Sequence, residues 1–167
     1  MAKNSIVLIG MAGAGKSTVG RILAQRLGYS FIDSDDLIEK KHSTTLQQLL
    51  NEQGYIRLRE LEEQALLTIE STRTVIATGG SAVYSERALR HLAGQALIVF
   101  LDAPFSTIKQ RIGDYSLRGL AKPEGQTLEA LFDERRPLYQ SYANFTISIS
   151  DASPNEIAAN ISNALKN

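Results

Sequence analysis

One stretch of the chain has the residue types and the spacing that hold phosphate groups. Residues 10–18 read Gly-Met-Ala-Gly-Ala-Gly-Lys-Ser-Thr, a match to the pattern G-x-x-x-x-G-K-[ST]. The glycines can adopt positive φ, so successive backbone N–H groups can point at one anion. Lys16 supplies a positive charge for the β- and γ-phosphates, and the Ser17 hydroxyl is suited to Mg²⁺. We expect a nucleoside triphosphate to bind through Gly13, Ala14, Gly15, Lys16, Ser17 and Thr18.

The residues on either side of this loop supply the context that such a site requires. Residues 5–9 form an apolar run typical of a short buried strand, and residues 19–27 place apolar side chains at helical spacing. A helix that begins at the loop directs its positive end toward a bound anion. A glycine-rich turn that only caps an ordinary helix is the alternative.

Acidic residues gather at the end of a second predicted strand. This strand covers residues 29–32 and is followed by Asp33, Asp35 and Asp36, which lead into a helix. One acidic residue is explained by capping that helix, but three within four positions are more than capping requires. In an open α/β sheet, ligands bind at the carboxyl ends of the strands. The acidic cluster is therefore a candidate part of the site.

Two further stretches have both a structural and a functional interpretation. Arg59 lies on a predicted helix, where a surface ion pair with Glu62 or Glu63 would account for it. The glycine pair at residues 79–80 follows a third predicted strand. Such a pair marks either a tight turn or a close approach of the backbone to another group, and the pattern favours neither.

Residues 113–126 interrupt the periodic pattern with three glycines, a proline and the basic residues Arg118 and Lys122. This stretch is longer than a plain connection needs, and long loops in ordered domains often act as lids. Disorder without a function is the alternative. We predict a lid.

Five short apolar segments alternate with helical patterns, which predicts a parallel sheet covered by helices on both faces. The sequence thus predicts one α/β domain over residues 1–167, a three-layer α/β/α fold. Two connections exceed the length of a crossover, so we expect a helical substrate-binding insertion at about residues 33–62 and a lid at about 113–126. The five predicted strands are residues 5–9, 29–32, 74–77, 96–101 and 144–149. We expect one helix before Gly54 and another after it, and further helices at about 85–92, 105–112 and 154–165.

The composition excludes several classes of protein. The net charge is zero without a block of like charges, so binding to nucleic acid is not indicated. The chain has no cysteine, which excludes disulfides and thiolate metal sites, and no apolar run approaches the length of a membrane span. Because the first predicted strand begins within a few residues of the start, we expect no signal peptide. We expect a cytoplasmic monomer without a nucleic-acid or membrane partner.

Among proteins that bind a nucleotide through such a loop, the residues favour a kinase of a small molecule. A GTPase would need an Asn-Lys-x-Asp motif after a strand, and the chain has none. A kinase needs a carboxylate near the acceptor hydroxyl, cations that hold the substrate, and a lid that excludes water. The chain contains candidates for all three.

The sequence resembles the shikimate kinase family over essentially its whole length. The resemblance implies a P-loop kinase fold and the transfer of a phosphoryl group from ATP, with Mg²⁺, to a hydroxyl of a small hydroxy-carboxylate, shikimate. The order and spacing of short motifs carry it: the loop at 10–18, Phe-Ile-Asp-Ser-Asp at 31–35, Gly54 followed by Arg59 and Glu62, Val-Ile-Ala-Thr-Gly-Gly at 75–80, Arg118, and Arg-Arg-Pro-Leu-Tyr at 135–139.

On the nucleotide side, the resemblance implies a role for each matching residue. Asp33 would lie beside the Mg²⁺, directly or through water, with Ser17 as the other protein ligand. Lys16 and Arg118 would stabilise charge on the transferred phosphoryl group. Arg111 resembles the arginine that stacks on adenine in this family.

On the acceptor side, the resemblance implies that Asp35 binds the acceptor hydroxyl and acts as the catalytic base or orients the hydroxyl. Arg59 and Arg135 would hold the acceptor carboxylate, since the planar guanidinium suits a bidentate contact. The remaining substrate contacts would come from Gly79, Gly80 and Ser81.

Several positions on the acceptor side and in the lid depart from the family pattern. Ser81 stands at a usual glycine, and Gly-Leu-Ala at 119–121 stands where Pro-Leu-Leu is common. Leu50 and Leu58 replace phenylalanines, and Tyr55 replaces a glutamate. These changes leave open a kinase of the same fold for another acceptor, such as a gluconate-like or hydroxy-amino acid, or a non-catalytic nucleotide-binding regulator.

Overall fold

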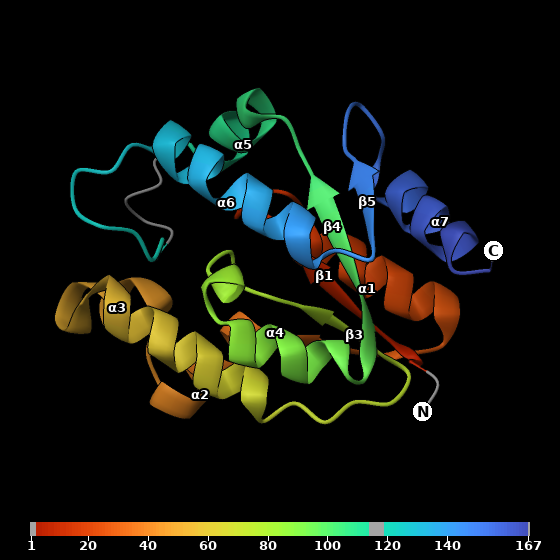
Figure 1. Cartoon of the computed structure of the whole chain (residues 1–167), viewed down its shortest axis with the longest axis horizontal. Helices are drawn as coiled ribbons and strands as arrows, with labels where there is room; N and C mark the ends of the chain where they lie inside the picture. The colour runs from red at the N-terminus through yellow and green to blue at the C-terminus, as the bar shows by residue number, and fades with distance from the viewer. Residues whose placement is uncertain (1–2, 114–118, 167) are drawn as a thin grey trace.

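The computed structural model describes residues 3–113 and 119–166, in which five strands form one parallel sheet. The strand order is β2-β3-β1-β4-β5 (Figure 1). Because β1 pairs with β3 on one side and with β4 on the other, its carboxyl end lies where the order of the strands reverses. The strands are β1 (Ser5–Ile9), β2 (Ser30–Asp33), β3 (Thr74–Ala77), β4 (Ala96–Asp102) and β5 (Phe145–Ser148).

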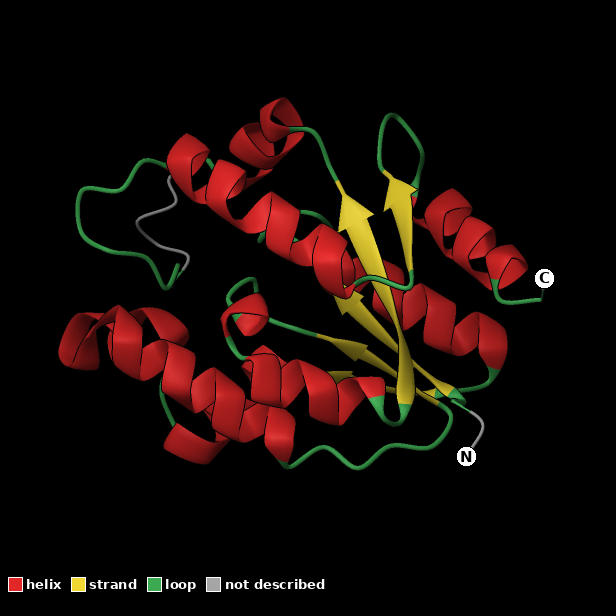
Figure 2. Ribbon diagram, viewed as in Figure 1, coloured by secondary structure: helices red, strands yellow, loops and turns green. Residues whose placement is uncertain are grey.

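Helices cover both faces of this sheet (Figure 2), which confirms the predicted three-layer fold. Helices α1 and α7 pack against each other on one face, and α4 and α6 contact β4 from the other. The described helices are α1 (Lys16–Leu27), α2 (Ser34–His42), α3 (Leu46–Leu67), α4 (Glu86–Ala93), α5 (Phe105–Ile112), α6 (Leu128–Tyr142) and α7 (Pro154–Ala164), with a short 3₁₀ turn, η1 (Ala82–Tyr84).

The core lies on the three central strands. Every residue of β1 and β3 is buried, as the continuous apolar runs indicate for strands covered on both faces. The outer strands β2 and β5 keep partly exposed residues. A second, smaller apolar cluster joins the helical insertion to the segment after residue 118: Ile38, Leu49, Leu58, Leu61 and Ala121.

The predicted elements agree with the observed ones to within a few residues. Helix α3 is a single run in place of the two predicted helices, but Gly54 inside it has φ 82° and ψ 169° and kinks it where the predicted break falls. Pro137 lies inside α6. Across residues 3–113 and 119–166, no helix combines the length and the apolar character that a membrane span needs.

Gly10 ties the phosphate loop to the sheet, and its substitution tests that link. Gly10 has φ +148°, and a Cβ there would lie 2.7 Å from the Leu101 carbonyl oxygen of β4. Gly10→Ala should therefore lower the free energy of unfolding by about 2–3 kcal/mol in urea denaturation. Gly28→Ala is the matched control, because Gly28 also has positive φ but open space around it; we expect a loss of about 1 kcal/mol. Equal losses would contradict the proposed contact.

Candidate active site

The carboxyl ends of three neighbouring strands bring the predicted residues together. The phosphate loop follows β1, Asp33 ends β2, and residues 78–81 follow β3. Thr78 fastens the last of these to β1, since its N–H and hydroxyl both donate to the Leu8 carbonyl oxygen, at 3.2 and 2.9 Å. Segments distant in sequence thus share one edge of the sheet, as parallel pairing requires.

Lys16 is fixed inside the loop. Its Nζ donates to the carbonyl oxygens of Gly10 and Met11 at 2.7 and 2.8 Å, which leaves a third N–H for another acceptor. Burial lowers the pKa of Lys16 to about 8, although the negative charges of Asp35 and Glu62 favour its ammonium form. The ammonium group is therefore poorly solvated and well placed to bind an anion.

Asp33 serves two neighbours with one carboxylate. It accepts from the Asp35 N–H at 3.0 Å as the N-cap of α2, and its other oxygen accepts from Ser17 Oγ at 2.5 Å. Capping and proximity to Ser17, which the sequence left as separate interpretations, are thus both properties of this residue. Two oxygen donors from two elements meet beside the loop.

A cleft of about 440 Å³ lies over the phosphate loop. Arg111 of α5 lines it and donates to the Gly13 carbonyl oxygen at 3.1 Å. Ala14 is placed differently from the prediction, because its side chain is buried in the core and its N–H donates to the Met11 carbonyl oxygen. Pro154 of α7 lines the cleft although the sequence gave no signal for it. The predicted residues that do line it are Gly13, Gly15, Lys16, Ser17, Thr18 and Arg111.

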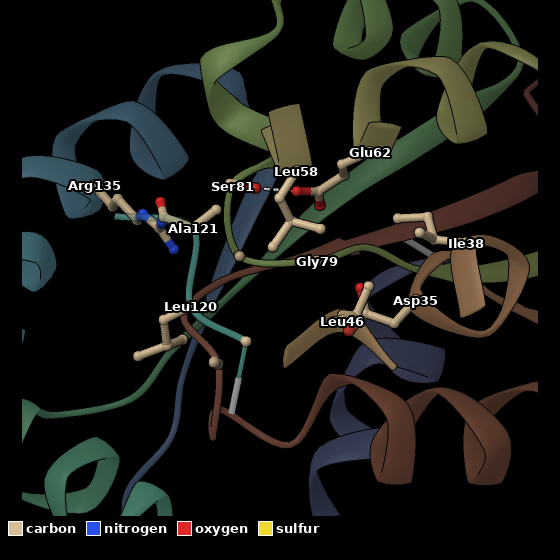
Figure 3. Close-up of a pocket in the computed structure, with 13 residues that line it drawn as sticks. Asp35, Ile38, Leu46, Leu58, Glu62, Gly79, Ser81, Leu120, Ala121 and Arg135 are labelled. Carbon is tan, nitrogen blue, oxygen red and sulfur yellow. Dashed lines mark hydrogen bonds between the residues drawn. The ribbon is translucent and has the colours of Figure 1, made fainter. Parts of the chain in front are cut away.

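A second, smaller cavity of about 50 Å³ adjoins this cleft (Figure 3). It has room for only a few water molecules. Four of the positions that depart from the family pattern line it, namely Leu58, Ser81, Gly119 and Ala121, whereas Leu50 and Tyr55 do not. Arg59, a predicted substrate ligand, does not line it either. The other lining residues are Ala12, Asp35, Ile38, Leu46, Glu62, Gly79, Gly80, Leu120 and Arg135.

Two carboxylates meet at the backbone of Gly79. A Cβ built on Gly79 would collide with Glu62 Oε1 and would lie 3.0 Å from Asp35 Oδ1, so a side chain at this position would crowd both acids. Burial, followed by the charges of Glu62 and Asp33, raises the pKa of Asp35 to about 7. The close-approach interpretation of the glycine pair is therefore correct.

The surface ion pair suggested for Arg59 is wrong. Glu62 is buried, accepts a hydrogen bond from the Ser81 hydroxyl, and makes no salt bridge within the described residues (Figure 3). Its other oxygen, Oε1, is buried and has no hydrogen-bond partner among residues 3–113 and 119–166, and burial raises the pKa of Glu62. Its spacing from Arg59 places both on one helix face, but only the fold shows that this face is inside.

Arg59 and Arg135 converge on one acceptor. Arg59 Nη2 and Arg135 Nη2 donate to the Ala121 carbonyl oxygen at 3.0 and 2.9 Å. They come from α3 and α6, so the structure brings together two arginines that are predicted to bind the acceptor carboxylate and lie 76 positions apart in the sequence. Arg118, predicted as a catalytic residue, lies outside the described residues.

The glycine pair is held on both sides. Gly79 N–H donates to Ser34 Oγ at 3.0 Å, so this predicted substrate-contact residue already has a protein acceptor for its N–H. Gly80 N–H has no acceptor in the described part of the chain, and the Gly80 carbonyl oxygen accepts from Tyr139 Oη at 2.6 Å. A Cβ on Gly80 would lie 2.8 Å from Arg135 Nη1. Tyr139 thus positions the peptide that faces the cavity.

Comparison with known proteins agrees with this arrangement. A family model described as "Shikimate kinase" matches residues 12–166. The chain belongs to the shikimate kinase family. A shikimate kinase from Thermobifida fusca (strain YX) is 39% identical over 162 residues, which cover 95% of this chain and 93% of that protein. Shikimate kinase 1 from Erwinia tasmaniensis is 36% identical, over 98% and 97% of the two chains.

Solved structures of the family share the fold. Shikimate kinase from Acinetobacter baumannii, in complex with shikimate, has a TM-score of 0.88 and 32% identity, and the match covers 98% of this chain and 93% of that one. The Aquifex aeolicus shikimate kinase has a TM-score of 0.80 and 30% identity over 97% and 96%. A sugar kinase from Janibacter, with 18% identity and a TM-score of 0.59, shares the fold alone.

The buried Glu62 makes the stability depend on pH. Because its pKa is raised, the stability that its protonated form contributes is present at low pH and lost as the pH rises through that pKa. Glu62→Gln keeps an acceptor for Ser81 and removes the charge. Its free energy of unfolding should exceed that of the wild type by about 1–3 kcal/mol at pH 8.5, and the two should converge near pH 5.

Urea denaturation at both pH values measures this difference, and Glu60→Gln is the control. Glu60 is a surface residue of the same helix that pairs with Arg57, so its loss should change stability little at either pH. A Glu62→Gln difference that is independent of pH would contradict the buried-carboxylate account.

Proposed function

We propose that this chain transfers the γ-phosphoryl group of ATP to a hydroxyl of shikimate. The position of Asp35 carries the proposal, because it lines both the cleft over the phosphate loop and the small cavity beyond it. A group that passes from nucleotide to acceptor must pass this carboxylate. Membership of the shikimate kinase family, and the shikimate bound to the A. baumannii relative, support the same acceptor.

In this proposal the cleft holds ATP and Mg²⁺. Mg²⁺ is usually held by one or two protein oxygens, phosphate oxygens and water, which the Ser17–Asp33 pair fits. No group of three or more potential metal ligands occurs among the described residues, so the protein alone offers no complete site. The ion, when bound, neutralises phosphate charge. Lys16 and Arg111 bind the nucleotide from the loop and α5.

Asp35 acts as the base. The acceptor hydroxyl gives its proton to the Asp35 carboxylate while its oxygen attacks the γ-phosphorus. The bond between the γ-phosphorus and the bridging oxygen breaks, and ADP leaves. A pKa of about 7 suits a group that must accept a proton near neutral pH. Arg118, in the predicted lid, is proposed to stabilise the charge on the transferred group.

The acceptor carboxylate takes the place of the Ala121 carbonyl oxygen. Arg59 and Arg135 both donate to that oxygen and have no carboxylate within 4.0 Å among the described residues. A cavity of about 50 Å³ is too small for a seven-carbon acid. Entry of the acceptor must therefore move Leu120 and Ala121, which supports a lid over residues 113–126 and an acceptor region in residues 33–62.

An ADP-release assay with ATP, Mg²⁺ and a panel of acceptors tests the function. We expect turnover with shikimate that depends on Mg²⁺, and little with gluconate or hydroxy-amino acids. Turnover with another acid but not with shikimate would show a same-fold kinase of different specificity. ATP binding without transfer to any acceptor would sink the proposal.

Asp35→Asn tests the base. We expect kcat to fall by about 10³-fold while the dissociation constant for ATP changes less than about threefold. The variant should be at least as stable as the wild type, since it removes a carboxylate that faces Glu62. Asp36→Asn, an exposed neighbour paired with Arg21, is the control. A kcat within tenfold of the wild type would remove Asp35 from the mechanism.

A further inference from the structure

We propose that Tyr84 is a positioning residue that holds the guanidinium groups of Arg59 and Arg135 together without neutralising them. This inference rests on the proposed function, in which the two arginines bind the acceptor carboxylate. Tyr84 ends η1, four residues after Gly80, and nothing in the sequence motifs pointed to it.

The ring of Tyr84 lies against both cations. The Arg59 Cζ atom is 3.8 Å from its centroid and the Arg135 Cζ atom is 5.3 Å away. A cation within about 6 Å of an aromatic face is attracted by the negative face of the ring, and the attraction is stronger where water is excluded. Arg135 is 1% exposed, so this contact forms in a poorly solvated place.

The hydroxyl of Tyr84 links Arg135 to Glu134 through two hydrogen bonds. It donates to Glu134 Oε1 at 2.6 Å and accepts from Arg135 Nε at 3.4 Å. Because its proton goes to Glu134, the oxygen presents its lone pairs to the arginine. The carboxylate therefore acts on Arg135 through a neutral phenol rather than by direct contact.

Two like charges that converge on one oxygen repel each other. Burial, and then the charge of Arg135, lowers the pKa of Arg59, while Tyr84 and Glu134 act in the opposite direction. Glu62 faces the pair from α3, but it is not within salt-bridge distance of either cation. The neighbouring Arg136 shows the alternative, since Asp102 neutralises it with contacts of 3.0 and 2.7 Å.

A carboxylate in the place of Tyr84 would hold the arginines more strongly but would also compete with the acceptor. A ring and a hydroxyl order the cations and leave their charge available for a ligand. Tyr55, which replaces a family glutamate, contacts Arg59 in the same way, with its ring centroid 5.0 Å from Cζ. Two aromatic rings thus lie against Arg59, and one of them stands where the family has a glutamate.

The inference is tested by changing Tyr84 in the protein and the carboxylate in the ligand, separately and together. Tyr84→Phe keeps the ring, and Tyr84→Leu removes both ring and hydroxyl. We expect the KM for shikimate to rise about threefold in the first variant and about tenfold or more in the second, with kcat and the KM for ATP changed less than about twofold. The carboxamide analogue of shikimate, measured as an inhibitor, should bind wild type and Tyr84→Leu within about twofold of each other.

Tyr142→Phe is the matched control, because the Tyr142 hydroxyl on α6 makes no hydrogen bond in the described part of the chain. It should leave all these constants unchanged. An unchanged KM for shikimate in Tyr84→Phe and Tyr84→Leu would overturn the inference. So would an equal loss of affinity for shikimate and the carboxamide, since a general distortion of the cavity would weaken both.

The two proposals fail in different ways. If the wild-type chain does not phosphorylate shikimate, the proposed function is wrong whatever the Tyr84 variants do. If the wild type is active and the variants keep its KM, only the role of Tyr84 is wrong. Should Tyr84→Leu prove unfolded by thermal denaturation, Tyr84→Phe, which retains the ring, decides the question by the same KM comparison.

Discussion

The parallel pairing of β2, β3 and β1 is the constraint on which the rest of the site depends. In parallel strands the carboxyl ends meet at one edge, so Asp33, the glycine pair and the phosphate loop are placed within reach of each other. Two hydrogen bonds from Thr78 to the Leu8 carbonyl oxygen fix the position of residues 78–81 relative to β1. Neither the loop nor the acids could form a site on separate sheets.

This edge concentrates charge that the interior does not favour. Lys16, Asp35 and Glu62 are held close together. Burial lowers the pKa of Lys16 and raises the pKa of Asp35 and of Glu62, which favours the neutral form of each. The glycines are required here because the acids approach the backbone on one side and Arg135 on the other. Burying these ionisable groups costs folding free energy, but it lets them face a charged substrate. Such a trade between stability and activity is common.

Two of the departures from the family pattern, Gly119 and Ser81, have physical explanations in this chain. Gly119 has φ +60°, donates its N–H to Gln47 Oε1 at 2.7 Å and lies so near Leu46 that a Cβ would collide with it. Proline, common there in the family, has neither an N–H nor access to that φ. The hydroxyl of Ser81 satisfies one oxygen of Glu62. Both residues line the small cavity and lie outside the phosphate loop.

The sequence by itself determined the five strands, the phosphate loop and the break at Gly54, whereas a shared site for Asp35, Arg59 and Arg135 was predicted only through the family resemblance. Such features follow from local periodicity and short motifs, which are written in adjacent residues. Only the tertiary structure decided that Glu62 is buried, that Gly79 donates its N–H to Ser34, that Ala14 faces the core and that Tyr84 contacts two arginines. Burial and partners depend on segments far apart in the chain, and no local pattern encodes the contacts that packing creates.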